Sequence, residues 1–480
     1  FGSSQLFQAA FITVMPCGVV HIGVGNFHRA HQAVFTDAAL KHDDQWNICG
    51  VSLRTEDRGF FGDLKNRNYS YHVWERGTES TVRKIDVHRQ LLVAPDEPDL
   101  VKAELSAERT RVVTLTITEK GFCLTPAGEL DMSLDTVQAD LALLRSGQSA
   151  TRTAAGVLVS GLAARRRSNF CGLAILSCDN VPGNGRCIRT GVMTLARLVD
   201  ERLLAWIESE VTFPSSMVDR ITPAPTPESL NSLKEAHGVE DPCAIVCESF
   251  LLWVIEDRFP HGRPPWDAVA DSLGGQCLFV PDVEPYERMK LYVLNAAHQV
   301  LAYPGLLLGY RFVHEALEDK RIQHLLRIYM REAVKSVPPV EGIDVPAWSE
   351  KTIRRFQNAA VKDTLLRLSE DSVARIEAAV LPQFSEDVTP GMTACAAVVF
   401  AAWTLYWAGA EDEMGNDFSR APDARGEPLA EKAVALRSHP SPTGAKDLLA
   451  SAYGEGAVFL AEPMSRALTD GIAVSIEKLS

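Results

Sequence analysis

The chain has 480 residues, of which 46% are hydrophobic and 23% charged, and this balance is typical of a globular protein with two or three domains. Its net charge of -14 and pI of about 5.4 argue against nucleic acid or an anionic membrane surface as a partner. We see no apolar run of about 18 residues, so we expect no membrane-spanning segment. The first residues lack the basic start of a signal peptide.

The ten cysteines are scattered along the chain and show no disulfide framework. We therefore expect reduced thiols in a cytoplasmic protein. Cys243 and Cys247 form a close pair, but no neighbouring Cys or His completes a zinc site. We expect no metal.

Five short apolar runs in the first 280 residues predict strands that alternate with helical stretches. They are GVVHI (18–22), WNICGVSL (46–53), RVVTLTIT (111–118), GLAILS (172–177) and PCAIVC (242–247). Because their apolar character is continuous rather than alternating, we expect both faces of these strands to be buried, as in a parallel sheet.

After about residue 281 the pattern becomes typical of helices. Apolar residues recur at three-and-four spacing over 285–335, 348–380 and 390–410, with loops at 337–346 and 411–428. We therefore predict an α/β fold: a Rossmann-type, doubly wound domain over residues 1–283, followed by a mainly α-helical domain over residues 284–480.

The loop after the first predicted strand is a candidate dinucleotide site. Gly23 permits a tight turn, and Gly25 lets the backbone approach a pyrophosphate at a helix N-terminus. The third glycine of the usual fingerprint is missing, because position 28 is His, so an ordinary glycine-rich turn fits as well. The candidate cofactor residues here are Gly23, Gly25, Asn26, Phe27 and Arg29, the last as a cation near phosphate.

Polar residues also follow the next three predicted strands, at the edge where open α/β sheets bind ligands. Glu56 and Asp57 follow the second strand, where an acidic group accepts hydrogen bonds from a ribose 2′-hydroxyl and favours NAD over NADP; a solvated acidic loop is the alternative. Glu119 and Lys120 follow the third strand. Asn180 follows the fourth, either as an amide donor to an alcohol oxygen or nicotinamide ribose, or as a loop cap.

The apolar segment 281–310 carries Lys290, Asn295 and His298. At about 100° per residue, Asn295 lies about 140° and His298 about 80° around the helix axis from Lys290. A cation, an amide and an imidazole on one side of a helix can hold and deprotonate an alcohol. A buried helix with three separately satisfied polar residues fits the same spacing.

Taken together, these segments resemble the polyol-specific long-chain dehydrogenases, the mannitol 2-dehydrogenase family, which includes D-arabinitol 4-dehydrogenase and fructuronate reductase. The matching stretches are VVHIGVGNFHRAHQAVFTD, TLTITEKGF, LSCDNVPGNG, TFPSSMVDRITP, WVIEDRFPHGRP and DVEPYERMKLYVLNAAHQVLAYPG. They run in family order from residue 19 to 306, and RRFQNAAVKDTLLRLSEDSVARI extends the match more loosely.

The resemblance implies a zinc-independent, NAD-dependent oxidation of a polyol to a ketose, with NADP a less favoured cofactor. Carried over by position, Lys290 is the general base, Asn295 and Asn180 stabilise the oxyanion, and His298 hydrogen-bonds the substrate. Burial in an apolar surface is the expected means of keeping such a lysine neutral. The expected partner is a small polyol or ketose, and the expected assembly is a monomer or a small homo-oligomer.

The chain departs from the family pattern at two places, and the first concerns the substrate. Where the family often has a lysine for the distal hydroxyls, this chain has Arg375, with Arg367 upstream, and Arg is not an equivalent replacement for Lys. Tyr292 replaces an arginine of the usual KLRLLN segment. A C5 or C6 alditol such as D-mannitol or D-arabinitol is the leading expectation.

Three alternatives remain open at this point. The first is hexuronate reduction, with Arg375 as the carboxylate site. The second is a non-catalytic NAD-binding protein, which has no need of Lys290. The third, a sugar-phosphate dehydrogenase, requires a phosphate-binding cluster that the sequence does not display.

Overall fold

The computed structural model describes residues 17–77, 80–383, 389–409, 411–417 and 419–479. These residues form two compact units. Unit 1 contains the described residues up to Glu75 and those from Ser80 to Pro281. Unit 2 contains Arg76, Gly77 and the described residues from Asp282 onward.

A five-stranded parallel sheet forms the centre of unit 1. Its strands are β1 (Val19–Ile22), β2 (Ile48–Ser52), β5 (His88–Val93), β6 (Val112–Leu115) and β7 (Ala174–Ser177), in the order β5-β2-β1-β6-β7. The strand order reverses at β1, which pairs with β2 on one side and β6 on the other. Doubly wound sheets bind ligands at the carboxyl edge beside such a switch point.

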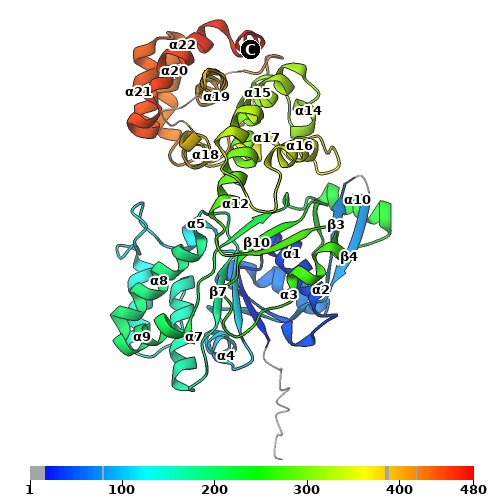
Figure 1. Cartoon of the computed structure of the whole chain (residues 1–480), viewed down its shortest axis with the longest axis vertical. Coiled ribbons are helices and arrows are strands. Elements are labelled where there is room, and N and C mark those ends of the chain that lie inside the picture. The colour runs from blue at the N-terminus through cyan, green and yellow to red at the C-terminus, as the bar shows by residue number, and fades with distance from the viewer. Residues whose placement is uncertain (1–16, 78–79, 384–388, 410, 418, 480) are drawn as a thin grey trace, which may run out of the picture. The chain divides into compact units, whose positions relative to one another are not determined.

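Helices cover both faces of this sheet (Figure 1). The helices α4 (Pro98–Ser106), α7 (Ala154–Arg167) and α8 (Asn184–Val199) enclose one apolar core, and α2 (Gln32–Ala39) with α3 (Arg58–Asn66) enclose the other. Alternate residues of β1 serve the two cores: Val20 and Ile22 enter the first, and Val19 enters the second. This two-sided burial explains the continuous apolar runs and confirms the predicted doubly wound arrangement.

One predicted strand is placed differently. The run at 242–247 was expected in the parallel sheet, but it contributes to β9 (Ile245–Glu248) in a small sheet ordered β4-β3-β9. The fifth parallel strand is β5, whose sequence HRQLLV begins with three polar residues and therefore lacks the continuous apolar pattern. A second small sheet has the order β11-β10-β8.

The other elements of unit 1 complete these layers. The strands of the small sheets are β3 (Tyr71–Arg76), β4 (Ser80–Ile85), β8 (Ser216–Asp219), β10 (Leu252–Glu256) and β11 (Gln276–Val280). The remaining helices are α1 (Asn26–Ala30), α5 (Thr118–Gly121), α6 (Asp135–Arg145), α9 (Glu201–Glu210), α10 (Pro227–His237) and α11 (Trp266–Ala270), with 3-10 turns η1 (Asp44–Trp46), η2 (Thr55–Asp57) and η3 (Asp271–Leu273).

Unit 2 is helical, as predicted, but its helices are shorter than the periodic segments. They are α12 (Glu284–Met289), the π-helical turn η4 (Lys290–Asn295), α13 (Ala296–Leu307), α14 (Val313–Ala316), α15 (Lys320–Ser336), α16 (Val345–Phe356), α17 (Leu365–Leu368), α18 (Ser372–Ala379), η5 (Leu381–Gln383), α19 (Pro390–Trp407), η6 (Glu427–Leu429), α20 (Ala430–Ser438), α21 (Pro442–Tyr453), η7 (Gly454–Leu460), α22 (Ala461–Asp470) and α23 (Ile472–Glu477). Gly309 follows the end of α13 and has a φ of +89°. A residue in this left-handed conformation commonly terminates a helix.

Within the described part of the chain, α19 is the one helix long and apolar enough to cross a membrane by length and composition alone. The sequence was expected to contain no such segment. In the structure α19 is mostly buried and packs against α13, α15 and α22 of unit 2. A helix that is apolar all round and enclosed by other helices is a core helix.

Candidate active site

The loop after β1 forms a tight turn that requires glycine at its first position. Gly23 has φ of +100°, and a Cβ on this residue would lie 2.1 Å from the carbonyl oxygen of Thr116. The Thr116 hydroxyl in turn donates to the carbonyl oxygen of Gly23 at 2.6 Å. Gly25 is exposed, and a Cβ there would have only the Gly23 oxygen within 4 Å, at 3.9 Å. The accessible backbone ahead of α1 fits the close approach of a dinucleotide pyrophosphate.

The side chains of α1 divide between the surface and the interior. Asn26 and Phe27, at its start, are partly exposed. Arg29 is 5% exposed, and its guanidinium donates to the carbonyl oxygen of Cys243 at 2.6 Å and to Asn26 Oδ1 at 2.7 Å. This placement differs from the expected cation beside a phosphate, because the guanidinium is turned into the fold and lies 4.3 Å from the centre of the Phe60 ring.

His28 occupies the position of the missing third glycine and is fully buried. Its ring stacks on His21 at a centroid distance of 3.4 Å, and its Nε2 lies 3.0 Å from Nε2 of His88. Burial holds the pKa of His28 well below its usual range and lowers the pKa of His21 and of His88 to about 3. The three imidazoles are therefore neutral at physiological pH.

The acidic residues after β2 differ in their contacts. Asp57 accepts a hydrogen bond on Oδ2 from the hydroxyl of Ser52, the last residue of β2, at 2.5 Å. This bond fixes the Asp57 carboxylate at the strand end. Glu56 is exposed and forms a long contact of 3.8 Å with Arg54. Asp57 is thus the better ordered of the two carboxylates.

The ends of β6 and β7 are joined by a buried carboxylate that the sequence analysis did not single out. Asp179 Oδ1 accepts the backbone amides of Ile117 and Thr118 at 2.7 and 2.6 Å. Exposed Glu119 and Lys120 continue this turn in α5, and exposed Asn180 directly follows Asp179. The sequence signal for Asp179 was an acidic residue two positions after the end of an apolar strand.

The parallel sheet brings the strand-end residues of unit 1 to one edge. β2, β1, β6 and β7 are successive neighbours in register, so their carboxyl ends lie side by side. The residues gathered there are Gly23, Gly25, Asn26, Phe27, Glu56, Asp57, Glu119, Lys120 and Asn180. Three of these groups fit the three parts of a dinucleotide. The turn at Gly23 fits the pyrophosphate, the carboxylate of Asp57 the adenosine ribose, and the amide of Asn180 the nicotinamide ribose.

Lys290 and Asn295 mark the two ends of the π-helical turn η4 in unit 2. The amide of Ala296 donates to the carbonyl oxygen of Leu291, five residues earlier, as in a π-helix. An α-helix was expected here, so the expected angle between Lys290 and Asn295 was wrong. Because a π turn takes more residues than an α turn, Asn295 comes round closer to the face of Lys290. Lys290 is 8% exposed.

His298 lies one turn further along, in α13. Its ring packs 4.8 Å from that of Phe356, and its Nε2 is buried without a hydrogen-bond partner in the described part of the chain. Burial, together with the positive charges of Arg367, Arg375, Arg355 and Lys290, holds the pKa of His298 well below its usual range. The imidazole is therefore neutral, with one ring nitrogen available to a ligand.

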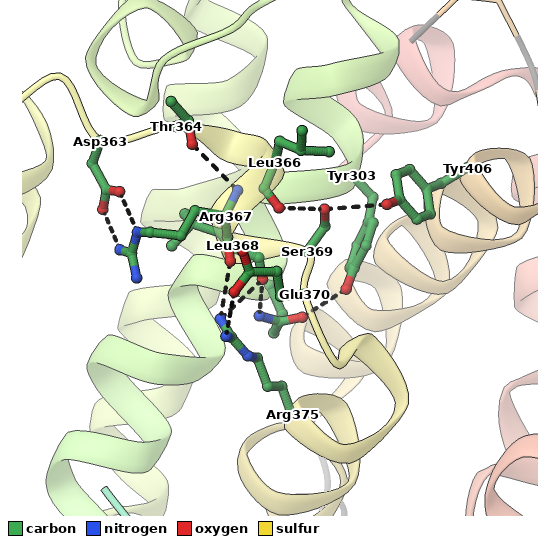
Figure 2. A network of polar contacts seen from close by, with 11 residues as sticks. Tyr303, Asp363, Thr364, Leu366, Arg367, Leu368, Ser369, Glu370, Arg375 and Tyr406 are labelled. Atoms are coloured by element: carbon green, nitrogen blue, oxygen red, sulfur yellow. Dashed lines mark hydrogen bonds and ion pairs between the residues drawn. The ribbon is translucent and has the colours of Figure 1, made fainter. Parts of the chain in front are cut away.

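The two predicted substrate arginines have unequal partners (Figure 2). Arg367, on α17, donates to both oxygens of Asp363 at 2.7 and 2.6 Å. Arg375, on α18, has a contact of 3.7 Å with exposed Glu370 and long hydrogen bonds of 3.3 and 3.4 Å to the carbonyl oxygens of Arg367 and Leu368. Arg367 is thus neutralised by a bidentate pair, whereas the charge of Arg375 is only loosely compensated.

Two further residues, missed from the sequence, hold the segment between these arginines. Gln299 Nε2 donates to the carbonyl oxygen of Leu368 at 2.9 Å, and the Tyr303 hydroxyl donates to Gln299 Oε1 at 2.7 Å. Their apolar helical context gave no signal. Asp363 could have been found, because it precedes Arg367 by four residues, a spacing typical of helical ion pairs.

Comparison with known protein families gives two adjacent matches. Residues 17–268 match the mannitol dehydrogenase Rossmann domain, and residues 282–450 match the mannitol dehydrogenase C-terminal domain. Among curated proteins, the chain is 38% identical to D-mannonate oxidoreductase of Escherichia coli (strain K12), over 83% of this chain and 81% of that protein. It is 34% identical to mannitol 2-dehydrogenase of Pyricularia oryzae, over 88% of this chain and 84% of that protein.

Among solved structures, the fold matches the ternary complex of Pseudomonas fluorescens mannitol 2-dehydrogenase with NAD and D-mannitol. The TM-score is 0.83 at 34% sequence identity, with 96% of this chain and 94% of that chain covered. The match extends over both units.

Proposed function

The chain belongs to the mannitol dehydrogenase family and is an NAD-dependent oxidoreductase, and from this premise we propose that it oxidises one secondary alcohol of a C5 or C6 alditol to the ketose. We assign NAD binding to residues 1–283 and the substrate-binding and catalytic groups, apart from Asn180, to residues 284–480. The observation that supports this best is the grouping, in unit 2, of buried Lys290, of Asn295 at the other end of its π turn, and of the unpartnered ring nitrogen of His298.

Lys290 is the proposed general base. A base must be neutral before it accepts a proton, and burial disfavours the charged form of an amine. The Lys290 side chain is buried, and arginines gather on the same surface around His298. The amine takes the proton of the substrate hydroxyl on Nζ. NAD, when bound, would supply the acceptor for the hydride of the carbon that carries this hydroxyl. One proton and one hydride thus leave the alcohol, and a ketone remains.

Asn295 and Asn180 are the proposed amide donors to the oxygen that loses its proton. Amides stabilise a developing negative charge without carrying a charge of their own. His298, held neutral by burial and by the surrounding cations, hydrogen-bonds a substrate hydroxyl through its free Nε2. A neutral imidazole adds no further positive charge to a surface that already holds Arg355, Arg367 and Arg375.

NAD is proposed to lie along the carboxyl edge of the parallel sheet. Gly23, Gly25, Asn26 and Phe27 receive the pyrophosphate, and Glu119 and Lys120 flank the edge at the end of β6. Asp57, whose Oδ2 is held by Ser52, keeps Oδ1 for a ribose hydroxyl, with Glu56 beside it. This negative charge disfavours the 2′-phosphate of NADP.

A second candidate substrate is a hexuronate or the corresponding aldonate. Arg375 favours it, because a guanidinium with only a 3.7 Å ionic contact can form a bidentate pair with a substrate carboxylate. A relative at 38% identity is named D-mannonate oxidoreductase. The alditol remains the leading proposal, because Lys290, Asn295 and His298 account for alcohol oxidation without any carboxylate.

The test is NAD reduction at alkaline pH with D-mannitol, D-arabinitol, D-sorbitol and D-mannonate, each over a full concentration range. Turnover of a neutral alditol with the highest kcat/KM supports the leading proposal. Turnover of mannonate alone replaces it with the sugar-acid proposal. NAD binding without turnover of any alcohol supports the non-catalytic alternative.

The wider setting is proposed as follows. The partner is a small polyol or ketose, and the protein works as a monomer or a small homo-oligomer. The ten free cysteines are compatible with a cytoplasmic location.

A further inference from the structure

Three neighbouring strand ends of unit 1 are tied together by side chains that no step of the proposed reaction uses. Asp179, which follows β7, accepts the amides of Ile117 and Thr118, which follow β6. Thr116, at the same end of β6, donates its hydroxyl to the carbonyl oxygen of Gly23, which follows β1. A continuous chain of hydrogen bonds and backbone therefore runs from β7 to the glycine turn.

The turn that Asp179 holds is strained. Thr118 has φ of +65°, a left-handed conformation that is unfavourable for a β-branched residue. Such a conformation persists only when its surroundings determine it. Here both amides of the turn, those of Ile117 and Thr118, donate to the single atom Asp179 Oδ1.

Asp179 is itself rigidly fixed. Its side chain is 7% exposed, and Oδ2 accepts the hydroxyl of Ser177 at 3.1 Å. Its backbone oxygen accepts Asn184 Nδ2 at 2.7 Å, and the same amide donates to Ser216 at 2.8 Å. A buried carboxylate with three donors to its two oxygens can impose a conformation on the segment that supplies those donors.

The glycine end of the chain of bonds is equally constrained. His21 Nε2 lies 3.0 Å from the Thr116 hydroxyl and 3.1 Å from the Gly23 oxygen. The three groups contact one another, so a shift of Thr116 changes the position of the Gly23 carbonyl group. A Cβ on Gly23 would overlap the carbonyl oxygen of Thr116, so the two backbones are also in close contact.

We propose that Asp179 is a positioning residue for NAD binding: by fixing the Ile117–Thr118 turn, it sets Thr116 against Gly23 and so holds the pyrophosphate turn in its binding geometry. The inference rests on the proposed placement of NAD at this edge. It is independent of which alcohol is oxidised.

The chain offers a matched control. Asp140, on α6, is also buried and also accepts two amides and a hydroxyl, those of Arg152 and Thr153, at 2.7 to 2.8 Å. None of these partners follows a strand of the parallel sheet. Replacing Asp140 therefore removes an equivalent set of bonds without touching the strand ends.

The experiment measures the Kd for NAD by calorimetry, without substrate, together with Tm for each variant. Asp179→Ala is expected to raise the Kd about tenfold or more, because both amides of the turn lose their acceptor. Asp179→Asn retains one oxygen for these amides, and its Kd is expected within about threefold of the original. Asp140→Ala is expected to lower Tm and leave the Kd for NAD unchanged.

An unchanged Kd in Asp179→Ala overturns the inference, and so does an equal loss of NAD binding in Asp140→Ala, which would mean that destabilisation alone is responsible. An equal loss in Asp179→Asn also overturns it, because the negative charge rather than the turn geometry would then matter. If Asp179→Ala does not fold, Asp179→Ser, whose hydroxyl is too short to reach both amides, replaces it under the same criteria. Absence of NAD binding in the unaltered protein would instead contradict the proposed placement of NAD.

Discussion

The backbone amide of Ala296 donates to the carbonyl oxygen of Leu291, five residues earlier, so Lys290 and Asn295 are joined by a π turn rather than by an α-helix. A π turn inside an α-helix costs regular hydrogen bonding and is often found at functional sites. Here it changes the angle between a buried amine and an amide. This geometry supports the proposal that one short segment serves both proton transfer and oxyanion binding.

Replacing Asn295 by alanine removes one proposed donor to the oxyanion. We expect kcat to fall about 10²- to 10³-fold, as for other single oxyanion donors, with the Kd for NAD unchanged. Asn180→Ala is expected to lower kcat similarly, and the double variant to lose less than the product of the two effects, because both residues are proposed to donate to one atom. Steady-state kinetics measure kcat, and calorimetry measures the Kd for NAD. A normal kcat in Asn295→Ala would show that Asn295 is not an oxyanion donor.

Neutralising the acidic end of β2 is expected to relax the choice of cofactor. In the variant Asp57→Ser with Glu56→Gln, the ratio of kcat/KM for NAD to that for NADP is expected to fall about tenfold or more, because a like charge no longer opposes the 2′-phosphate. Glu56→Gln alone serves as the control and is expected to have the smaller effect, since Glu56 is exposed. An unchanged ratio in the double variant would place the discriminating charge elsewhere.

Arg375 and Arg367 are expected to respond differently to substitution. Arg375→Ala is expected to raise KM for the substrate about tenfold, because Arg375 is proposed to bind its distal end. Tm is expected to stay unchanged, since the contacts of this arginine with its neighbours are long. Arg367→Ala leaves Asp363, which is 6% exposed, without its bidentate partner, and is expected to lower Tm as well. If Arg375→Ala affects sugar acids and alditols equally, Arg375 is not a carboxylate site.

Acid sensitivity follows from the buried histidines. The folded-state pKa of His21 and of His88 is about 3, below the unfolded value of 6.5, so the unfolded chain binds more protons at acidic pH. Stability is therefore fully present above about pH 6.5 and is lost as the pH falls toward 3. At pH 5 the loss is roughly 2 kcal/mol for each such histidine.

The check is denaturant unfolding between pH 5 and pH 8. The free energy of unfolding is expected to be flat near pH 7 to 8 and to decline below pH 6.5. His88→Gln is expected to reduce the slope of this decline, even if it lowers stability overall. A slope that is identical in His88→Gln would show that His88 is not buried in its neutral form.

Much of the strand-end edge could be predicted from the sequence, because parallel strands bring their carboxyl ends together whatever the intervening helices do. The positions of Gly23 and Asp57 at this edge were predicted in this way. Asp179 was missed because its role depends on amides about sixty residues away in the chain. The placement of Arg29 differs for a similar reason: its acceptor, the carbonyl oxygen of Cys243, is 214 residues distant.

In unit 2 the sequence predicted the helices and the polar residues but not the local geometry. Apolar periodicity does not distinguish an α turn from a π turn, so the relative direction of Lys290 and Asn295 was wrong. Arg367 and Arg375 were expected as similar substrate contacts. Only the structure distinguishes them, because the bidentate pair with Asp363 engages Arg367.

The central claim is that Lys290 is the base for alcohol oxidation, and the most direct measurement is kcat for Lys290→Ala with its preferred alcohol, with and without added methylamine. We expect kcat to fall about 10²- to 10⁴-fold, the Kd for NAD to remain unchanged, and methylamine to restore part of the rate in its neutral form. Lys290→Arg, which keeps a long basic side chain but stays protonated and cannot act as a base, is expected to show no more activity than Lys290→Ala. A kcat near that of the unaltered protein in Lys290→Ala would contradict the account.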